Sequence, residues 1–334
     1  MRKILVIFMA MVPMALWAQF APAQDQPGTT AMHADSTAFV GWATGCVAEP
    51  GPMNISNPSL GTAGAGYPAE NAIGAPDGTY GVTCLGDGGM ATVTFASPIC
   101  NGEGPDFAVF ENGFRNAMDT TLWFLEIGFV EVSSDGMNFF RFPAVTNVQY
   151  ETQIGGFACM NPVNIHNFAG KYGAFYGTPF DLDEVPDNPL LDKNSITHVR
   201  IIDVVGNINP DYANYDSEGH PVNDPWPTPF ASGGFDLDAV GVIHDQAHQA
   251  ITENDAETIS VYPNPAHGYI HVGANHYSPV KNVELYSITG QKILSSTETE
   301  INVSGLEPGV YFIRIECECR DTIHRIFTER VIIK

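Results

Sequence analysis

The sequence predicts an all-β protein, with a jelly-roll-like β-sandwich followed by a small immunoglobulin-like β-sandwich. Short runs of β-branched and aromatic residues recur along the chain, and long loops rich in Gly, Pro, Asn and Asp separate them. Amphipathic helical patterns of useful length are missing from the sequence. A polar, acidic connector at residues 245–257 divides the chain, so we expect the larger sandwich over residues 39–244 and the smaller one over residues 258–334.

The N-terminal residues have the features of a secretory signal peptide. Arg2 and Lys3 precede an apolar run that ends at Leu16, and Ala18 closes a plausible cleavage site. This run is too short to cross a bilayer comfortably, and no later segment reaches transmembrane length. We therefore expect residues 1–18 to be a signal peptide and the mature chain to be soluble outside the inner membrane. Residues 19–38 are small and polar, which predicts a disordered segment.

The centre of the larger sandwich is predicted at residues 106–144. Apolar side chains occupy both alternating series of residues 124–133, which is typical of a strand buried on one face and largely covered on the other. The turn at residues 133–136 and the aromatic run after it close a β-hairpin. Further strands are expected at residues 91–99, 197–206 and 233–243.

The chain is strongly acidic, with 14 Lys and Arg against 38 Asp and Glu and a net charge of −24. Phosphate backbones and anionic membranes would repel it, so nucleic acid is excluded as a partner. Two explanations of the excess carboxylates stay open: they keep an exported protein soluble, or several of them bind calcium outside the cell.

The six cysteines of an exported chain make disulfides reasonable. Cys84 and Cys100 bracket one apolar segment and could pair across neighbouring elements. Cys46 has no convincing His or Asn partner pattern, so a disulfide is a better explanation for it than a nucleophile.

The loop over residues 207–234 is a candidate calcium site. Oxygen-bearing side chains at alternating positions surround a glycine that permits a tight reversal, which suits a hard cation. A histidine occupies a place usually filled by Asp or Asn, and no glutamate closes the loop at the EF-hand distance, so a solvated acidic loop is the alternative. The candidate ligands in this loop are Asp216, Glu218 and Asp224.

Aromatic residues cluster in two predicted loops, residues 171–180 and 210–230. Flat rings flanked by Asn and Asp can stack on a sugar or a planar macrocycle and direct hydrogen bonds to it. The alternative is that these rings pin long loops onto the sandwich. The candidate ligand-binding residues are Tyr172, Tyr176, Tyr212, Tyr215 and Trp226.

Paired carboxylates offer a hydrolytic alternative. Asp236 and Asp238 lie two positions apart on a strand and so face one side, where they could serve acid–base hydrolysis or hold a cation. A polar outer face explains them as well. Asp106 and Glu111 form a weaker pair of the same kind. The two histidines at 244 and 248 have zinc-protease spacing but open a polar linker without a supporting helix. We expect a protein that is not an enzyme.

The C-terminal part resembles a known sorting module. YPNP at residues 262–265, TGQ at 289–291 and LEPGVY at 306–311 stand in the order typical of the type A C-terminal sorting domain of the Bacteroidetes type IX (Por) secretion system. This resemblance implies passage across the outer membrane by the type IX machinery. It also implies later removal of residues 258–334 as the protein is released or attached to the cell surface.

The front part resembles a group of Bacteroidetes cell-surface proteins and, in layout, galactose-binding-like jelly rolls. The matching segments are GAPDG at residues 74–78, PDFAVFEN at 105–112, VEVSSDG at 130–136 and GFDLDAV at 234–240. Similar jelly rolls often hold a structural calcium near the first of these loops, which makes Asp77 a further metal candidate. As a simple turn residue, Asp77 needs no metal.

These features together predict a secreted or surface-attached, non-enzymatic binding protein. The jelly-roll resemblance favours a glycan as its ligand, with Ca²⁺ as a candidate stabilising ion. A micronutrient such as a corrinoid (cobalamin) is the second ligand class, because the resembling surface proteins accompany outer-membrane nutrient uptake. A secreted hydrolase and a structural or adhesive surface protein are the remaining alternatives.

Overall fold

The structure, a computed structural model, describes residues 20–248, 260–273, 280–318 and 324–334, without the side chains of residues 317–327. It divides into two compact units, Met1–Gln249 and Ala250–Lys334. The expected signal peptide and most of the expected connector lie outside the described residues. Among the residues described, no helix is long and apolar enough to cross a membrane.

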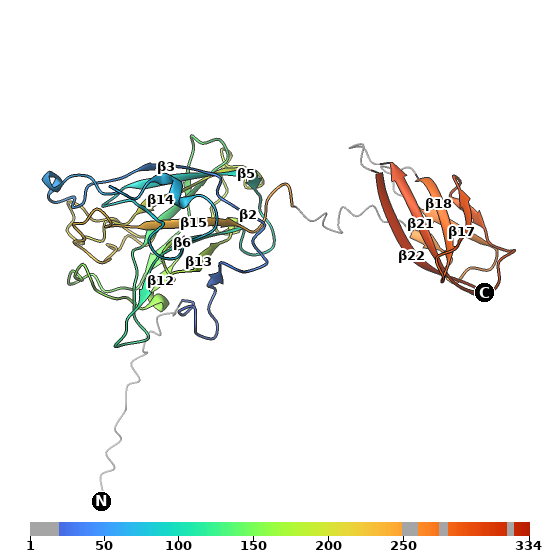
Figure 1. Cartoon of the computed structure of the whole chain (residues 1–334), viewed down its shortest axis with the longest axis horizontal. Helices are drawn as coiled ribbons and strands as arrows, with labels where there is room; N and C mark the ends of the chain where they lie inside the picture. The colour runs from blue at the N-terminus through green and yellow to red at the C-terminus, as the bar shows by residue number, and fades with distance from the viewer. Residues whose placement is uncertain (1–19, 249–259, 274–279, 319–323) are drawn as a thin grey trace, which may run out of the picture. The chain divides into compact units, whose positions relative to one another are not determined.

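The front unit is a sandwich of two antiparallel sheets, with β15, β6 and β13 in one layer and β3, β14 and β5 in the other (Figure 1). The first sheet has the order β1 (Met32–His33), β13 (Tyr176–Phe180), β6 (Phe107–Glu111), β15 (Asp236–Val242) and β2 (Gly41–Trp42), with β4 (Thr83–Cys84) also paired to β15. The second has the order β10 (Phe140–Arg141), β9 (Gly128–Ser133), β14 (Ile196–Asp203), β5 (Met90–Ile99) and β3 (Gly45–Glu49).

Short elements complete this unit. Two-stranded ribbons are formed by β7 (Phe114–Arg115) with β8 (Trp123–Phe124) and by β11 (Val145–Thr146) with β12 (Ile165–His166). The helical segments of the described chain are short 3₁₀ turns, η1 (Pro58–Leu60), η2 (Ala69–Ala72), η3 (Pro162–Asn164) and η4 (Leu182–Glu184). The all-β fold class predicted from the sequence is confirmed.

The central strand β9 is buried along its whole length. Val130 and Val132 belong to the core between the two sheets, whereas Phe129 belongs to a second cluster with Phe168. The expected strand over residues 124–133 is present only as β9 from residue 128 onward, since residue 124 belongs to β8 and residues 125–127 are not in a strand. Within β9 both faces are covered, and the alternation divides its side chains between two cores. Other members of the core between the sheets are Val93, Phe107, Val109, Val199, Ile201, Leu237 and Val240.

The segment expected to be disordered is instead ordered from residue 20 onward. The Phe20 amide donates to the Val163 carbonyl at 3.0 Å, and the Ala23 side chain is buried. Further along, β1 pairs with β13 through Met32 and Gly177. Composition misled here, because a small polar segment can be held by backbone hydrogen bonds to an existing sheet edge.

The cysteine pairing considered above is not formed, because Cys84 is a free, buried thiol on β4. Its strand pairs with the start of β15, with Cys84 opposite Asp236. Cys46 is also a free thiol.

The C-terminal unit is a second, smaller sandwich. One sheet has the order β16 (Ser260–Tyr262), β17 (Tyr269–Gly273), β20 (Glu300–Asn302); the other has β19 (Lys292–Ser296), β18 (Val280–Ser287), β21 (Gly309–Glu318), β22 (His324–Ile333). Ile270 and Ile301 of the first sheet share a core with Leu285 and Ile313 of the second. Asn264 of the YPNP motif donates to the Arg330 carbonyl at 2.8 Å and accepts from the Ile332 amide at 3.0 Å, so the motif fastens the start of this unit to its last strand.

Candidate functional site

A pocket of about 460 Å³ opens in the front unit where β6 ends and β15 begins. Its volume is within the usual range for small-molecule sites. Three connections supply most of its wall: the loop before β4, the segment around β7 and β8, and the end of the loop over residues 207–234. The lining includes Tyr67, Thr79, Tyr80, Asn112, Phe114, Phe124, Glu126, Phe157, Thr228, Phe230, Ser232 and Asp236.

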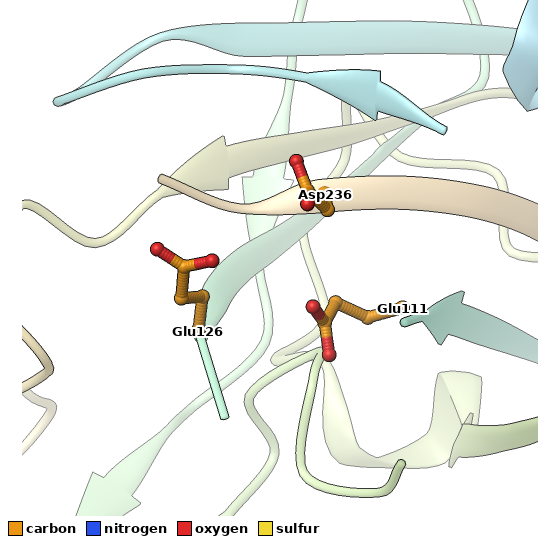
Figure 2. Close-up of side chains that lie close together, drawn as sticks. All are labelled: Glu111, Glu126 and Asp236. Carbon is orange, nitrogen blue, oxygen red and sulfur yellow. The ribbon is translucent and has the colours of Figure 1, made fainter. Parts of the chain in front are cut away.

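Three carboxylates meet at this place. Glu111 is the last residue of β6, Asp236 is the first residue of β15, and Glu126 lies in the extended segment before β9. The two strands are paired, with Leu237 opposite Glu111, so the sheet itself brings two of the carboxylates together. One oxygen from each carboxylate lies within 4.8 Å of the others, and Figure 2 shows the three groups turned toward a common space.

Each of these side chains is only partly satisfied by hydrogen bonds. The Gly113 amide donates to Glu111 Oε2 at 2.7 Å, the Gly234 amide to Glu126 Oε1 at 3.1 Å, and the Asn112 side chain to Asp236 Oδ2 at 3.1 Å. The Cys84 thiol, opposite Asp236 in the sheet, also donates to the Asp236 carboxylate. Glu111 Oε1 and Asp236 Oδ1 are nevertheless buried without a hydrogen-bond partner. Buried carboxylate oxygens without partners are costly, so this arrangement demands a proton or a cation.

Burial dominates the electrostatics of the cluster. It raises the pKa of Glu111 and of Glu126 well above the usual glutamate value, and the charge of Asp236 raises both further. Burial likewise raises the pKa of Asp236 to about 6. The lining of the described pocket contains no lysine, arginine or histidine that could neutralise these groups.

A row of aromatic rings borders the pocket. Phe114 stacks on Phe124 with ring centres 5.0 Å apart, Phe124 lies 6.4 Å from Phe157, and Phe157 lies 6.0 Å from Phe230. Phe157 is 76% exposed, and Tyr80, which also lines the pocket, is 84% exposed. Contiguous solvent-exposed aromatic rings beside a pocket are typical of a binding surface.

Asp238 supports one wall of the pocket instead of entering it. Its two carboxylate oxygens accept from the amides of Asp77 and Gly78, both at 2.8 Å. This bidentate contact holds the GAPDG loop against β15, and the next residues of that loop, Thr79 and Tyr80, line the pocket. Asp236 and Asp238 are therefore both buried, and the polar outer face considered for them is not present.

The structure separates the second carboxylate pair considered for hydrolysis. Asp106 directly precedes β6 and Glu111 is its last residue, so the two are roughly 16 Å apart along an extended chain. Asp106 accepts from the Leu182 and Gly102 amides and contacts His244 Nδ1 at 2.8 Å, so it organises the other end of the sheet.

The five aromatic residues singled out in the sequence all lie outside the pocket lining. Tyr172 is buried and its hydroxyl is 2.8 Å from the Thr30 hydroxyl, while Tyr176 lies on β13 against His33. The indole of Trp226 donates to Asp87 at 3.0 Å. Tyr212 is half-buried, and Tyr215 is 46% exposed. The predicted loops do reach the pocket, but through Ala174, Thr228 and Phe230.

None of the four metal candidates from the sequence belongs to the cluster of Glu111, Glu126 and Asp236, but Asp224 lies near it: its charge raises the pKa of Glu111 and Glu126, and its Oδ1 is buried without a hydrogen-bond partner. Asp216 accepts from the amides of Glu218 and His220, both at 2.9 Å, and so closes its own loop, leaving Glu218 exposed. Asp224 accepts from the Ile127 amide at 3.0 Å. Asp77 is exposed and accepts only from the Thr79 hydroxyl in the described structure.

Glu126 was not identified as a site residue from the sequence, because it lies within the alternating apolar residues that predict a buried strand. A glutamate among Phe124, Leu125 and Ile127 was itself a signal, because buried glutamates need a special reason. Glu111 and Asp236 were noted, but in pairs with their strand neighbours and not with each other.

Residues 260–329 match the family model of the secretion system C-terminal sorting domain. A search of curated proteins found no match for the chain. The C-terminal unit is therefore a type IX sorting domain, and the chain is exported by that system as a secreted or cell-surface protein. The resemblance of the front unit to surface jelly rolls stays a prediction.

Proposed function

We propose that the front unit is a non-enzymatic, surface-exposed binding module that captures a small glycan in the pocket described above. The observation that carries this proposal is the row of phenylalanine rings beside buried carboxylates, in which Phe114, Phe157 and Phe230 are exposed and Phe124 is half-buried. A sugar presents an apolar face that stacks on aromatic rings and hydroxyl groups that donate to carboxylate oxygens.

The acidic groups of the site favour neutral sugars over anionic ligands. A pocket lined by the carboxyl groups of Glu126 and Asp236, without any basic side chain in its lining, offers an anionic ligand no counter-charge, whereas the hydroxyl groups of a neutral sugar can hydrogen-bond to these groups. The corrinoid alternative is tested with the same purified chain. A structural or adhesive role explains neither the pocket nor the aromatic rings that border it.

The test is a glycan array with the purified full chain, followed by titration calorimetry of each hit and a corrinoid titration in parallel. Phe157→Ala and Phe230→Ala should each weaken glycan binding by tenfold or more, because both rings leave the stacking surface. Tyr215→Ala is the matched control, since Tyr215 is an exposed ring that does not line the pocket. Loss of binding in Tyr215→Ala alone would place the ligand on the acidic loop and contradict the proposal.

A secreted glycosidase is the second candidate, favoured by the close approach of Glu111, Glu126 and Asp236 within 4.8 Å. Retaining glycosidases hold two carboxyl groups about 5–5.5 Å apart, one of them with a raised pKa. Incubation of each bound glycan with the protein, with release of reducing ends as the readout, separates the candidates. Sustained turnover that Glu126→Gln abolishes would establish the enzyme and exclude a pure binding module.

A further inference from the structure

The carboxylate cluster, of which Glu126 and Asp236 line the pocket, has free ligand atoms and no counter-charge. Glu111 is 1% exposed and Asp236 is 6% exposed, and each keeps one buried oxygen without a hydrogen-bond partner. Glu126, also 6% exposed, belongs to both the cluster and the pocket lining. Among the described residues, none of the three carboxylates takes part in a salt bridge with a basic side chain.

The geometry fits a single ion between the carboxylates. Two oxygens on opposite sides of a Ca²⁺ ion are about 4.6–5.2 Å apart, because each Ca–O bond is about 2.3–2.6 Å long. The three ligand atoms of the cluster lie within 4.8 Å of one another, which places them around one such centre. The donor set is entirely oxygen, which suits a hard cation such as Ca²⁺, whereas zinc sites are mostly built from Cys and His.

We propose that Glu111, Glu126 and Asp236 bind one Ca²⁺ ion at the edge of the pocket that Glu126 and Asp236 line. Three side chains leave several of the six to eight positions of a Ca²⁺ ion for other oxygens. Glu126 and Asp236 line the pocket, so the open positions face it and take water or ligand hydroxyl groups. Export to the cell exterior places the site where calcium is abundant. This proposal goes beyond the function proposed above and does not depend on a glycan being the ligand.

The first test is titration of Ca²⁺ into the chelator-treated full chain by calorimetry, together with thermal unfolding with and without the ion. We expect one ion per chain and a rise in the melting temperature of the front unit. Asp236→Asn and Glu111→Gln keep the side-chain shape and remove a ligand charge, so each should weaken Ca²⁺ binding at least tenfold. With chelator present, both variants should melt at or above the wild-type temperature, because the repulsion among the carboxylates is relieved.

Glu218→Gln is the matched control, since Glu218 is an exposed carboxylate of the acidic loop. It should bind Ca²⁺ like the wild type. Absence of binding in the wild-type chain, or binding that Glu218→Gln removes and Asp236→Asn leaves intact, overturns the proposal.

A second measurement needs no change in the ligands. Tb³⁺ in this site should luminesce on tyrosine excitation, because Tyr67 and Tyr80 line the same pocket, and Ca²⁺ should displace it. Failure of Ca²⁺ to compete, or a signal unchanged in Glu126→Gln, contradicts the site. If the chain binds calcium but no glycan, the calcium site stands and the glycan proposal fails. If the chain binds a glycan but no calcium, the glycan proposal stands and the calcium site fails.

Discussion

Lys171 shows how one residue can oppose the stability of the sandwich. Its side chain is buried, and its ammonium lies 5.5 Å from the centre of the Tyr172 ring, without a salt bridge to any described carboxylate. Burial lowers the pKa of Lys171 from 10.5 to about 8. Below pH 8 the folded protein therefore carries a desolvated charge that the unfolded chain would hold in water.

We predict that Lys171→Met stabilises the protein at pH 7 by on the order of 1–3 kcal/mol. The pKa of Lys171 is lower in the folded state than in the unfolded state. Between about pH 8 and 10.5 the folded wild-type protein therefore binds fewer protons than the unfolded protein, so its stability rises with pH in this range. The advantage of the variant should thus shrink over this range. Chemical denaturation of both proteins from pH 7 to 10.5 measures it, and a difference that stays constant contradicts the assigned cause.

At the scale of elements, the first three residues of strand β15 contribute both to the carboxylate cluster and to the anchoring of a pocket loop. Asp236, at its first position, enters the carboxylate cluster, and Asp238 anchors the GAPDG loop. The strand pairs with both β4 and β6, and its register shifts between Leu237 and Ala239. A bulge of this kind redirects side chains beside functional sites.

We predict that Asp238→Asn destabilises the front unit by about 1.5–3 kcal/mol, because two charge-assisted hydrogen bonds to buried amides are weakened. Faster hydrogen exchange at the Asp77 and Gly78 amides should accompany the loss, and ligand affinity should fall as Tyr80 shifts. Asp77→Asn is the control, since the exposed Asp77 side chain accepts a hydrogen bond only from the Thr79 hydroxyl in the described structure. Equal effects of the two substitutions would show that Asp238 is not the anchor.

At the scale of the whole molecule, the chain combines a front unit that carries the pocket and a C-terminal unit that carries the export signal. Each unit has its own hydrophobic core, around Val132 and Leu237 in the first and around Leu285 and Ile313 in the second. Separate cores allow one unit to be removed without exposing the interior of the other.

We predict that a chain ending at His248 stays in the periplasm, because the sorting domain is missing, while its front unit unfolds at the wild-type temperature. Cell fractionation with immunoblotting locates the protein, and thermal unfolding of the purified fragment measures its stability. The full-length chain in the same strain is the control. Surface display of the shortened chain would contradict the assignment of the sorting function to residues 260–329.

The sequence by itself determined the fold class, the two-part organisation and the export route. Strand alternation around Val130 and turn signals such as Ser133–Gly136 are local, so they can be seen without the fold. The sorting motifs are also local, and the match over residues 260–329 confirms them. The order of residues 20–38 was missed because it depends on a sheet edge that local composition does not reveal.

Only the tertiary structure decided where the pocket lies. Three separate parts of the chain supply the cluster: β6 carries Glu111, the segment before β9 carries Glu126, and β15 carries Asp236. The pairing of β6 with β15 brings together Glu111 and Asp236, which are 125 positions apart in the sequence. The sequence could indicate the two loops with aromatic residues, but not that Tyr172 and Trp226 hold the loops while Phe157 and Phe230 stay in water. The reason is physical: burial and proximity are set by the register between distant strands, and a linear pattern of residue types does not contain that register.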